Sequence, residues 1–164
     1  MSVTAYIALG SNLEQPAQQV SAALAALTTL PHCHNVCASS LYATTPVGYA
    51  DQPDFVNAVA RLDTTLDAPA LLEALLALET RFGRVRSFRN APRVLDLDLL
   101  LYGEHCQDSP TLTLPHPRMH ERAFVLVPLA ELAAALQIPG RGRVVDCLAD
   151  CDQSGIYRLD ILPG

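Results

Sequence analysis

The chain has 164 residues, 50% of them apolar, which predicts one folded domain over residues 1–164 with a real hydrophobic core. The 17 acidic residues outnumber the 11 basic ones and give a formal net charge of −6, which excludes a generally basic nucleic-acid coat protein. All 11 basic residues are arginine, which excludes mechanisms that need lysine: the Walker-A phosphate loop, the protein-kinase strand lysine and the Schiff base.

Apolar periodicity and turn residues predict short strands and helices along the chain. In the first half they are a strand over 5–9, a helix over 16–30 that Pro31 ends, a strand over 36–42, a turn-rich segment over 44–53, a strand over 55–62, and a helix that Asp67 caps and Gly83 ends. In the second half they are a strand over 95–102, an extended segment over 111–114, a helix within 122–136 that starts or breaks near Pro128, and a short helix and an edge strand within 144–159.

The strand over 95–102 has the clearest pattern. Its even face begins with Asp96 and Asp98, and its odd face is apolar throughout: Leu95, Leu97, Leu99 and Leu101. The order strand, helix, strand, strand, helix, strand predicts an α+β fold, a ferredoxin-like sandwich with helices on one face of a mainly antiparallel sheet.

Asp96 and Asp98 are candidate metal ligands. Their two-residue offset on a strand puts both carboxylates on one face, with Cα atoms roughly 6.5 to 7 Å apart. Two unpaired carboxylates repel each other, and a divalent cation bound through oxygen relieves that repulsion and can also contact phosphate. The alternative is an exposed strand face with two solvated acids.

An arginine-rich segment precedes these aspartates. Residues 80–95 hold five arginines and no acidic residue, and Gly83 and Pro92 favour a loop over 84–93. Because arginine stays charged and offers a planar fork, such a loop can close over a polyphosphate whose metal lies on the aspartates. The alternative is a solvated basic loop or an RNA-binding patch, but RNA binding is less typical of a loop with a single aromatic residue, Phe88, and no RNP motif.

Two further segments carry binding candidates. In the irregular stretch 114–122, His116 and Arg122 are candidates for phosphate binding, and a solvated turn is the alternative. Phe55 and Asn57 lie two residues apart at the start of a strand, on one face, where they can stack on and hydrogen-bond a flat heterocycle. The alternative is a core phenylalanine and an asparagine that satisfies a turn.

The sequence has no signal-peptide pattern and no stretch near 18 uninterrupted apolar residues, so we expect a cytoplasmic protein without a membrane partner. Its five cysteines are an odd number outside a secretory context and are expected to be thiols. The alternative is a zinc site built from the two Cys-x-x-x-Cys pairs and the histidines beside the first, although zinc sites more often have tighter spacing.

Several of these segments occur together in one known family. The chain resembles the 6-hydroxymethyl-7,8-dihydropterin pyrophosphokinases of the folate pathway over nearly its whole length. The resemblance lies in the run Arg-Asn-Ala-Pro-Arg-Val-Leu-Asp-Leu-Asp-Leu-Leu over 89–100 and, in family order, in segments 10–13, 44–48, 51–57, 83–86 and 115–124. It implies a ferredoxin-like fold that binds ATP with two magnesium ions, transfers the terminal pyrophosphoryl group to the hydroxymethyl oxygen of the pterin, and releases AMP.

The resemblance also implies a role for individual residues. Asp96 and Asp98 would bind magnesium, and Arg84 and Arg93 would be the catalytic arginines of the loop. ATP would be bound by Arg86, Arg89, Thr113, His116 and Arg122. The pterin would lie between Phe55 and Phe124, with Asn57 and backbone groups of Thr44, Pro46 and Val47 completing its pocket. Glu79 would line the site through hydrogen bonds, the alternative being an exposed helix carboxylate.

Four residues depart from the family pattern: Leu76 where some members have Gln, Asn90-Ala91 in place of a frequent Trp-Gly, and Pro117 in place of an aromatic residue. We expect them to affect ATP affinity and loop closure more than reaction type. A monomer that binds these small molecules and no nucleic acid is expected. The competing hypothesis is a ferredoxin-like binding module that uses the arginine loop for nucleic acid or acidic partners.

Overall fold

The computed structural model describes residues 2–12, 15–44, 55–82 and 95–159. The whole arginine loop over 84–93 and all of the turn-rich segment over 44–53 except Thr44 therefore lie outside the described residues. Among the described residues, no helix is long and apolar enough to cross a membrane, and all five cysteines are free.

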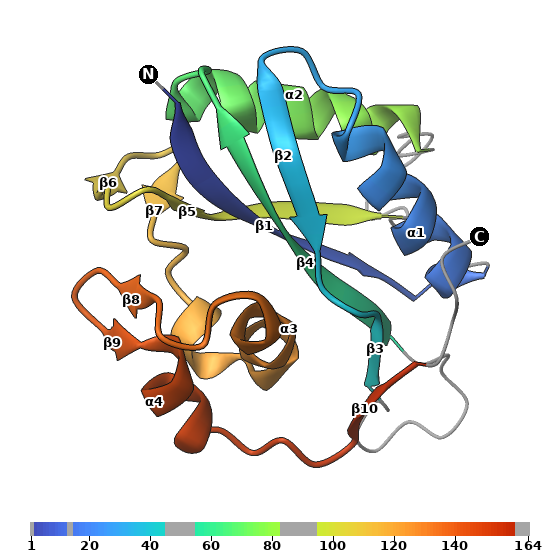
Figure 1. Ribbon diagram of the computed structural model, residues 1–164, viewed down its shortest axis with the longest axis vertical. Helices are drawn as coiled ribbons and strands as arrows, with labels where there is room; N and C mark the ends of the chain where they lie inside the picture. The colour runs from blue at the N-terminus through green and yellow to red at the C-terminus, as the bar shows by residue number, and fades with distance from the viewer. Residues whose placement is uncertain (1, 13–14, 45–54, 83–94, 160–164) are drawn as a thin grey trace.

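A six-stranded antiparallel sheet forms the centre of the fold (Figure 1). The strand β1 (Val3–Ser11) lies between β4 (Phe55–Thr64) and the edge strand β5 (Asp96–Tyr102). The other side of β4 pairs with β2 (Cys33–Ala38) and β3 (Tyr42–Thr44), and β10 (Ile156–Arg158) pairs with β3. The predicted α+β class with a mainly antiparallel sheet is confirmed.

The single strand predicted over 36–42 is divided into β2 and β3, and Ser39 explains the division. Its backbone N–H donates to the Val59 carbonyl at 2.8 Å, and its Oγ accepts from the Val59 N–H at 2.9 Å. A side-chain oxygen therefore replaces a backbone carbonyl in the ladder at this point. The hydroxyl in turn donates to the Ser40 carbonyl.

The helices α1 (Pro16–Leu27) and α2 (Ala68–Arg81) cover one face of the sheet, where they pack on Ile7, Leu9 and Leu62. Their buried residues recur at helical spacing, as the sequence predicts: Val20, Ala23 and Leu27 in α1, and Leu71, Leu75 and Leu78 in α2. Asp67 caps α2 as predicted, with Oδ1 accepting from the Ala70 N–H at 2.9 Å.

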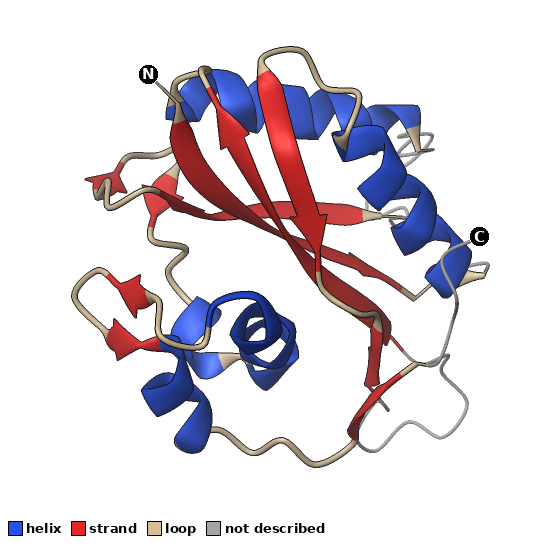
Figure 2. Cartoon of the chain, viewed as in Figure 1, coloured by secondary structure: helices blue, strands red, loops and turns tan. Residues whose placement is uncertain are grey.

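The opposite face is covered by α3 (Ala123–Ala133) and α4 (Val144–Ala149), so the prediction of helices on one face only is wrong (Figure 2). Leu126 and Leu129 of α3 pack here against Val59 of the sheet. The predicted start or break near Pro128 is also wrong, because α3 begins at Ala123 and continues through the proline. Proline lacks an N–H, so the helical bond to the Phe124 carbonyl cannot form.

A β-bulge in β5 changes the side to which its last residues point. Leu101 pairs with Tyr6 and Leu99 pairs with Ile7, so Leu100 is an extra residue between them. Leu95, Leu97 and Leu99 pack under α1 and α2 as predicted, whereas Leu101 joins the core under α3. The prediction that Leu101 shares their face is therefore wrong.

Short elements complete the chain. The hairpin of β6 (Gln107–Asp108) with β7 (Thr113–Leu114) includes part of the predicted extended segment 111–114. A single 3-10 turn, η1 (Met119–Glu121), precedes α3, and the hairpin of β8 (Gln137–Ile138) with β9 (Gly142–Arg143) follows it. The short helix and edge strand predicted within 144–159 are present as α4 and β10.

Candidate active site

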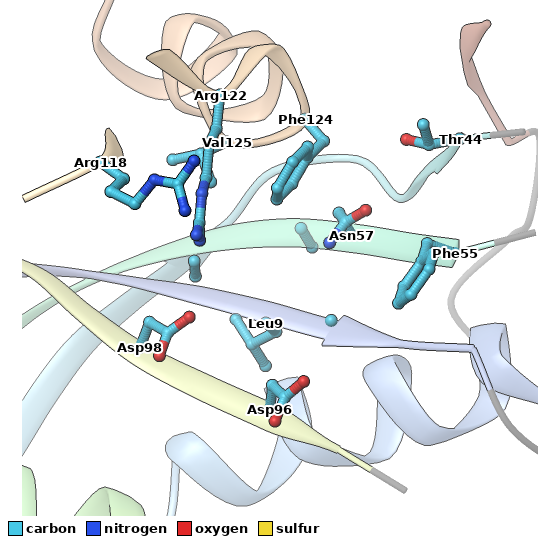
Figure 3. Close-up of a pocket in the computed structure, with 13 residues that line it drawn as sticks. Leu9, Thr44, Phe55, Asn57, Asp96, Asp98, Arg118, Arg122, Phe124 and Val125 are labelled. Carbon is cyan, nitrogen blue, oxygen red and sulfur yellow. The ribbon is translucent and has the colours of Figure 1, made fainter. Parts of the chain in front are cut away.

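A cavity of about 500 Å³ opens over the end of the sheet that α3 leaves uncovered (Figure 3). Its floor comes from β1, β4 and β5, and its opposite wall comes from the turn before α3 and from the first residues of that helix. The lining residues are Ala8, Leu9, Gly10, Thr44, Phe55, Asn57, Ala58, Asp96, Asp98, Arg118, Arg122, Phe124 and Val125.

Strand register brings the polar residues of the floor together. Gly10 of β1 lies opposite Asp96 on one side and opposite Asn57 on the other, and Ala8 lies opposite Asp98. Directly opposed residues of antiparallel strands point to the same face. Because the two β1 positions carry only a hydrogen and a methyl group, the longer side chains of both neighbouring strands can extend over them.

Gly10 is required by the close approach of Asn57. A Cβ atom at position 10 would lie 2.8 Å from Asn57 Nδ2. Contacts this short are not made by real Cβ atoms, so any other residue at position 10 would push the amide away from the floor. The glycine thus sets the position of the predicted pterin-binding amide.

Two buried polar atoms at this end of the cavity have no hydrogen-bond partner within the part of the chain that the structure describes: Asn57 Oδ1 and Thr44 Oγ1. Leaving such an atom unpaired costs about 1–3 kcal/mol, so both atoms point to a ligand with hydrogen-bonding groups. Phe55, which is 40% exposed, and Phe124 of α3 flank Asn57 (Figure 3). The predicted aromatic pair and amide are brought together in one pocket.

Asp96 and Asp98 line the same cavity from β5, as predicted for two carboxylates on one strand face (Figure 3). Asp96 is half-buried and Asp98 is exposed. Among the described residues, no group of three His, Cys, Asp or Glu side chains is arranged to hold a metal ion. A cation on these two carboxylates would therefore need further oxygen ligands from a substrate or from water.

Arg122 and Arg118 face the aspartates from the opposite wall (Figure 3). Arg122 is the residue before α3, and its Cζ lies 5.7 Å from the centroid of the Phe124 ring, a cation–π contact. Arg118 was not among the predicted site residues. The one feature of the sequence that could have indicated it is its position two residues after His116, in a stretch rich in His and Arg.

A second cavity of about 350 Å³ adjoins the first, and Asp98 lines both. It lies between the end of α2, the edge strand β5 and the β6–β7 hairpin. Its lining is more polar than that of the first cavity, and it includes residues predicted to bind ATP. Its lining residues are Leu72, Leu76, Glu79, Leu97, Asp98, Leu99, Ser109, Pro110, Thr111, Leu112, Thr113, His116 and Pro117. Thr113, His116 and Glu79 thus lie together, and two separate binding spaces meet at one carboxylate.

Two hydrogen bonds, one to the backbone and one to the ring, fix the position of His116 and the orientation of its imidazole. Its backbone N–H donates to the Leu100 carbonyl at 2.9 Å, and its Nδ1 accepts from the Arg118 N–H at 3.3 Å. Burial, and further the positive charges of Arg122, Arg141 and Arg118, lower the pKa of His116, and the charge of Asp98 opposes them in part. The ring is therefore neutral near pH 7, with its proton on Nε2, where it is available as a hydrogen-bond donor.

Glu79 is buried, with 3% of its surface exposed, so the alternative of an exposed helix carboxylate is wrong. Its Oε2 accepts from the Leu97 N–H at 2.6 Å. Leu97 lies between the two aspartates on β5, and within the described residues no strand pairs with the outward edge of β5. Glu79 thereby ties α2 to the strand that carries Asp96 and Asp98.

Six of the predicted site residues lie outside the described residues: Pro46, Val47, Arg84, Arg86, Arg89 and Arg93. The departures at Asn90 and Ala91 lie there too. The other predicted residues all line one of the two adjoining cavities.

Comparison with known proteins identifies the family. The profile of the family "7,8-dihydro-6-hydroxymethylpterin-pyrophosphokinase (HPPK)" matches residues 6–134. The 2-amino-4-hydroxy-6-hydroxymethyldihydropteridine pyrophosphokinase of Pseudomonas aeruginosa is 52% identical over 154 residues, covering 94% of this chain and 95% of that protein. The Haemophilus influenzae protein of the same name is 50% identical over 137 residues, covering 84% and 86%.

Solved structures show the same fold. A Plasmodium falciparum HPPK-DHPS crystal structure superposes with a TM-score of 0.70 at 12% identity and covers 91% of this chain. The chain spans 45% of the length of that protein. At this identity the likeness concerns the fold alone, and the family rests on the sequence matches: the chain belongs to the 7,8-dihydro-6-hydroxymethylpterin pyrophosphokinase family.

Proposed function

We infer that this protein transfers pyrophosphate from ATP to the hydroxymethyl group of 6-hydroxymethyl-7,8-dihydropterin, yielding the pterin diphosphate and AMP, a step in tetrahydrofolate biosynthesis. The observation that carries this function is the meeting of two cavities at Asp98. One cavity offers an aromatic pair and unpaired amide and hydroxyl atoms, and the other offers a neutral histidine and hydroxyl groups. A reaction between two bound substrates needs such adjoining spaces.

The first cavity fits a flat heterocycle with a hydrogen-bonding edge. Phe55 and Phe124 would stack on the two faces of the pterin, and Asn57 Oδ1 would accept from its amide-like edge. Thr44 supports this role with its side chain as well, since Thr44 Oγ1 is the other unpaired buried atom. We propose that Pro46 and Val47 complete the pocket.

The second cavity would hold ATP. Leu72 and Leu76 give it an apolar wall, and Thr113 would lie near the adenosine. The Nε2–H of His116 would donate to a phosphate oxygen, and Arg122 would bind the phosphates where the two cavities meet. We propose that Arg86 and Arg89 add to this binding from the loop.

Asp96 and Asp98 fit magnesium, which takes oxygen ligands and is bound through few carboxylates when phosphate supplies the others. Two ions held there would neutralise the triphosphate and polarise its oxygens. Arg84 and Arg93 are proposed as the catalytic arginines, which would stabilise the charge that moves to the leaving AMP. The pterin hydroxymethyl oxygen bonds to Pβ while the bond from Pβ to the oxygen bridging to Pα breaks. We assign no general base.

The test is product identification. The protein, magnesium, ATP and the hydroxymethyldihydropterin should yield AMP and pterin diphosphate in equal amounts, and omission of the pterin should abolish AMP release. Formation of ADP, or no turnover, contradicts the proposed function. In that event, salt-sensitive RNA binding in the absence of magnesium would favour the binding-module hypothesis.

A further inference from the structure

Arg118 lines the cavity without a role in the function proposed above. It is exposed, it extends from the turn before η1, and together with Arg122 it lines the cavity from the wall opposite Asp98 (Figure 3). Within the part of the chain that the structure describes, neither arginine makes an ion pair. Two guanidinium groups on the same cavity wall both add positive charge there, and an anion with several oxygens that both could reach would offset that charge.

Several hydrogen bonds hold the backbone of this turn, so the Cα atom of Arg118 has a fixed position. The Arg118 N–H donates to His116 Nδ1, and its carbonyl accepts from the Glu121 N–H at 3.1 Å. From the β8–β9 hairpin, Arg141 donates to the Pro117 carbonyl at 2.9 Å, and its guanidinium also contacts the His120 ring. A fixed backbone lowers the entropic cost of placing a long side chain on a ligand.

The location of Arg118 selects which part of the ligand it would contact. Arg118 lines the cavity that holds the pterin candidates but not the adjoining groove with Thr113 and His116. It also lies on the wall that faces Asp98, the residue common to the two cavities. A group bound by Arg118 would therefore lie closer to the pterin than the adenosine of ATP does.

We propose that Arg118 binds the transferred diphosphate group, acting with Arg122 as a two-guanidinium clamp. The clamp holds this group at the end of ATP before transfer and on the pterin after it. Because the unreacted pterin carries no phosphate, Arg118 contributes to the affinity for the diphosphate product and not to the affinity for the pterin substrate. This inference rests on the proposed function for the identity of the product.

The test compares two ligands on Arg118→Ala by calorimetric titration in the presence of magnesium. The affinity for the pterin diphosphate should fall about tenfold, as expected for the loss of a charged hydrogen-bonding partner, while the affinity for the hydroxymethyldihydropterin stays within about twofold. Arg118→Gln should behave like Arg118→Ala, and it provides a second variant if the first is poorly folded. Arg143→Ala, which removes an exposed arginine paired with Asp146 elsewhere, should change neither affinity.

An equal loss of affinity for both ligands would show that Arg118 only maintains the structure and would overturn the proposal. Unchanged affinity for both would overturn it as well. Inorganic pyrophosphate serves as a third probe, because its binding does not depend on turnover or on the identity of the acceptor. If the wild-type protein does not transfer pyrophosphate, the proposed function fails. If pyrophosphate binds equally well to wild type and Arg118→Ala, the clamp fails.

Discussion

Gly10 lies directly under the Asn57 side-chain amide. A Cβ at this position would lie 2.8 Å from Asn57 Nδ2, so Gly10→Ala should move the amide out of the pterin pocket. We expect the KM for the pterin to rise about tenfold, because the free energy of one lost hydrogen bond, at the upper end of its usual range, corresponds to about that factor. The value of kcat should change little.

A double-mutant cycle tests this mechanism. If Gly10 acts through Asn57, the double variant Gly10→Ala/Asn57→Ala should have the KM of Asn57→Ala alone. Additive effects of the two substitutions would contradict the mechanism, because they would mean that the methyl group disturbs the site by another route.

Asp98 is the residue shared by both cavities, and its carboxylate is the proposed magnesium ligand. Asp98→Asn should lower kcat by about a thousandfold or more, since a metal at phosphoryl oxygens contributes several kcal/mol to the transition state. The unfolding midpoint should change little because the side chain is exposed. The matched control is Asp63→Asn on β4, at the opposite end of the sheet, which should stay active. Normal magnesium-dependent turnover of the Asp98 variant would refute the metal role.

At the scale of elements, Glu79 joins α2 to β5 through the bond to the Leu97 N–H. Glu79→Ala should lower the free energy of unfolding by about 1–3 kcal/mol, because it leaves a buried donor without its acceptor. Glu79→Gln retains an acceptor oxygen and should recover part of the loss. Denaturant unfolding measures both, with Glu73→Ala on the exposed side of the same helix as the control. Equal stability of the two alanine variants would contradict this role.

A second connection between elements joins α3 to β3. Glu131 Oε1 accepts from the Tyr42 hydroxyl at 2.6 Å, and the same carboxylate accepts from the Ser40 N–H. Burial, and next the bond to Glu131, raises the pKa of Tyr42 from 10.0 to about 12. This link helps to keep α3, and with it Phe124, over the sheet.

The raised pKa of Tyr42 predicts a pH dependence of stability. The folded protein holds the Tyr42 proton more tightly than the unfolded chain does. The stabilisation is therefore fully present below pH 10.0 and is lost as the pH rises towards about 12. Tyr42→Phe should make the free energy of unfolding fall less steeply over this range in urea titrations. An unchanged slope in Tyr42→Phe would count against the assignment.

At the scale of the whole molecule, local patterns predicted the parts of the fold that depend on local physics. Asp67 caps α2 as its position before Ala-Pro indicates, and the two-residue spacing of Asp96 and Asp98 places both on the cavity side of β5. The side of the sheet on which α3 packs was not predictable in this way. It depends on contacts between segments far apart in the chain, such as Leu126 with Val59.

The bulge at Leu100 shows the same limit within a single strand. Period-two alternation predicts Leu101 on the face of Leu99, and only pairing with Tyr6 and Ile7 reveals the extra residue. Arg118 was missed for a related reason, because an irregular turn has no periodicity that assigns a direction to its side chains. The single domain, the monomeric state, the cytoplasmic location and the roles of the loop arginines remain predictions.

The proposed reaction moves the β- and γ-phosphoryl groups of ATP to the pterin as one unit. The most direct measurement follows ATP labelled separately at the β- and at the γ-phosphate in the presence of magnesium and the hydroxymethyldihydropterin. Both labels should appear in the pterin product in a one-to-one ratio, and neither should remain on an adenine nucleotide. Transfer of the γ label alone, with the β label retained in ADP, would contradict it.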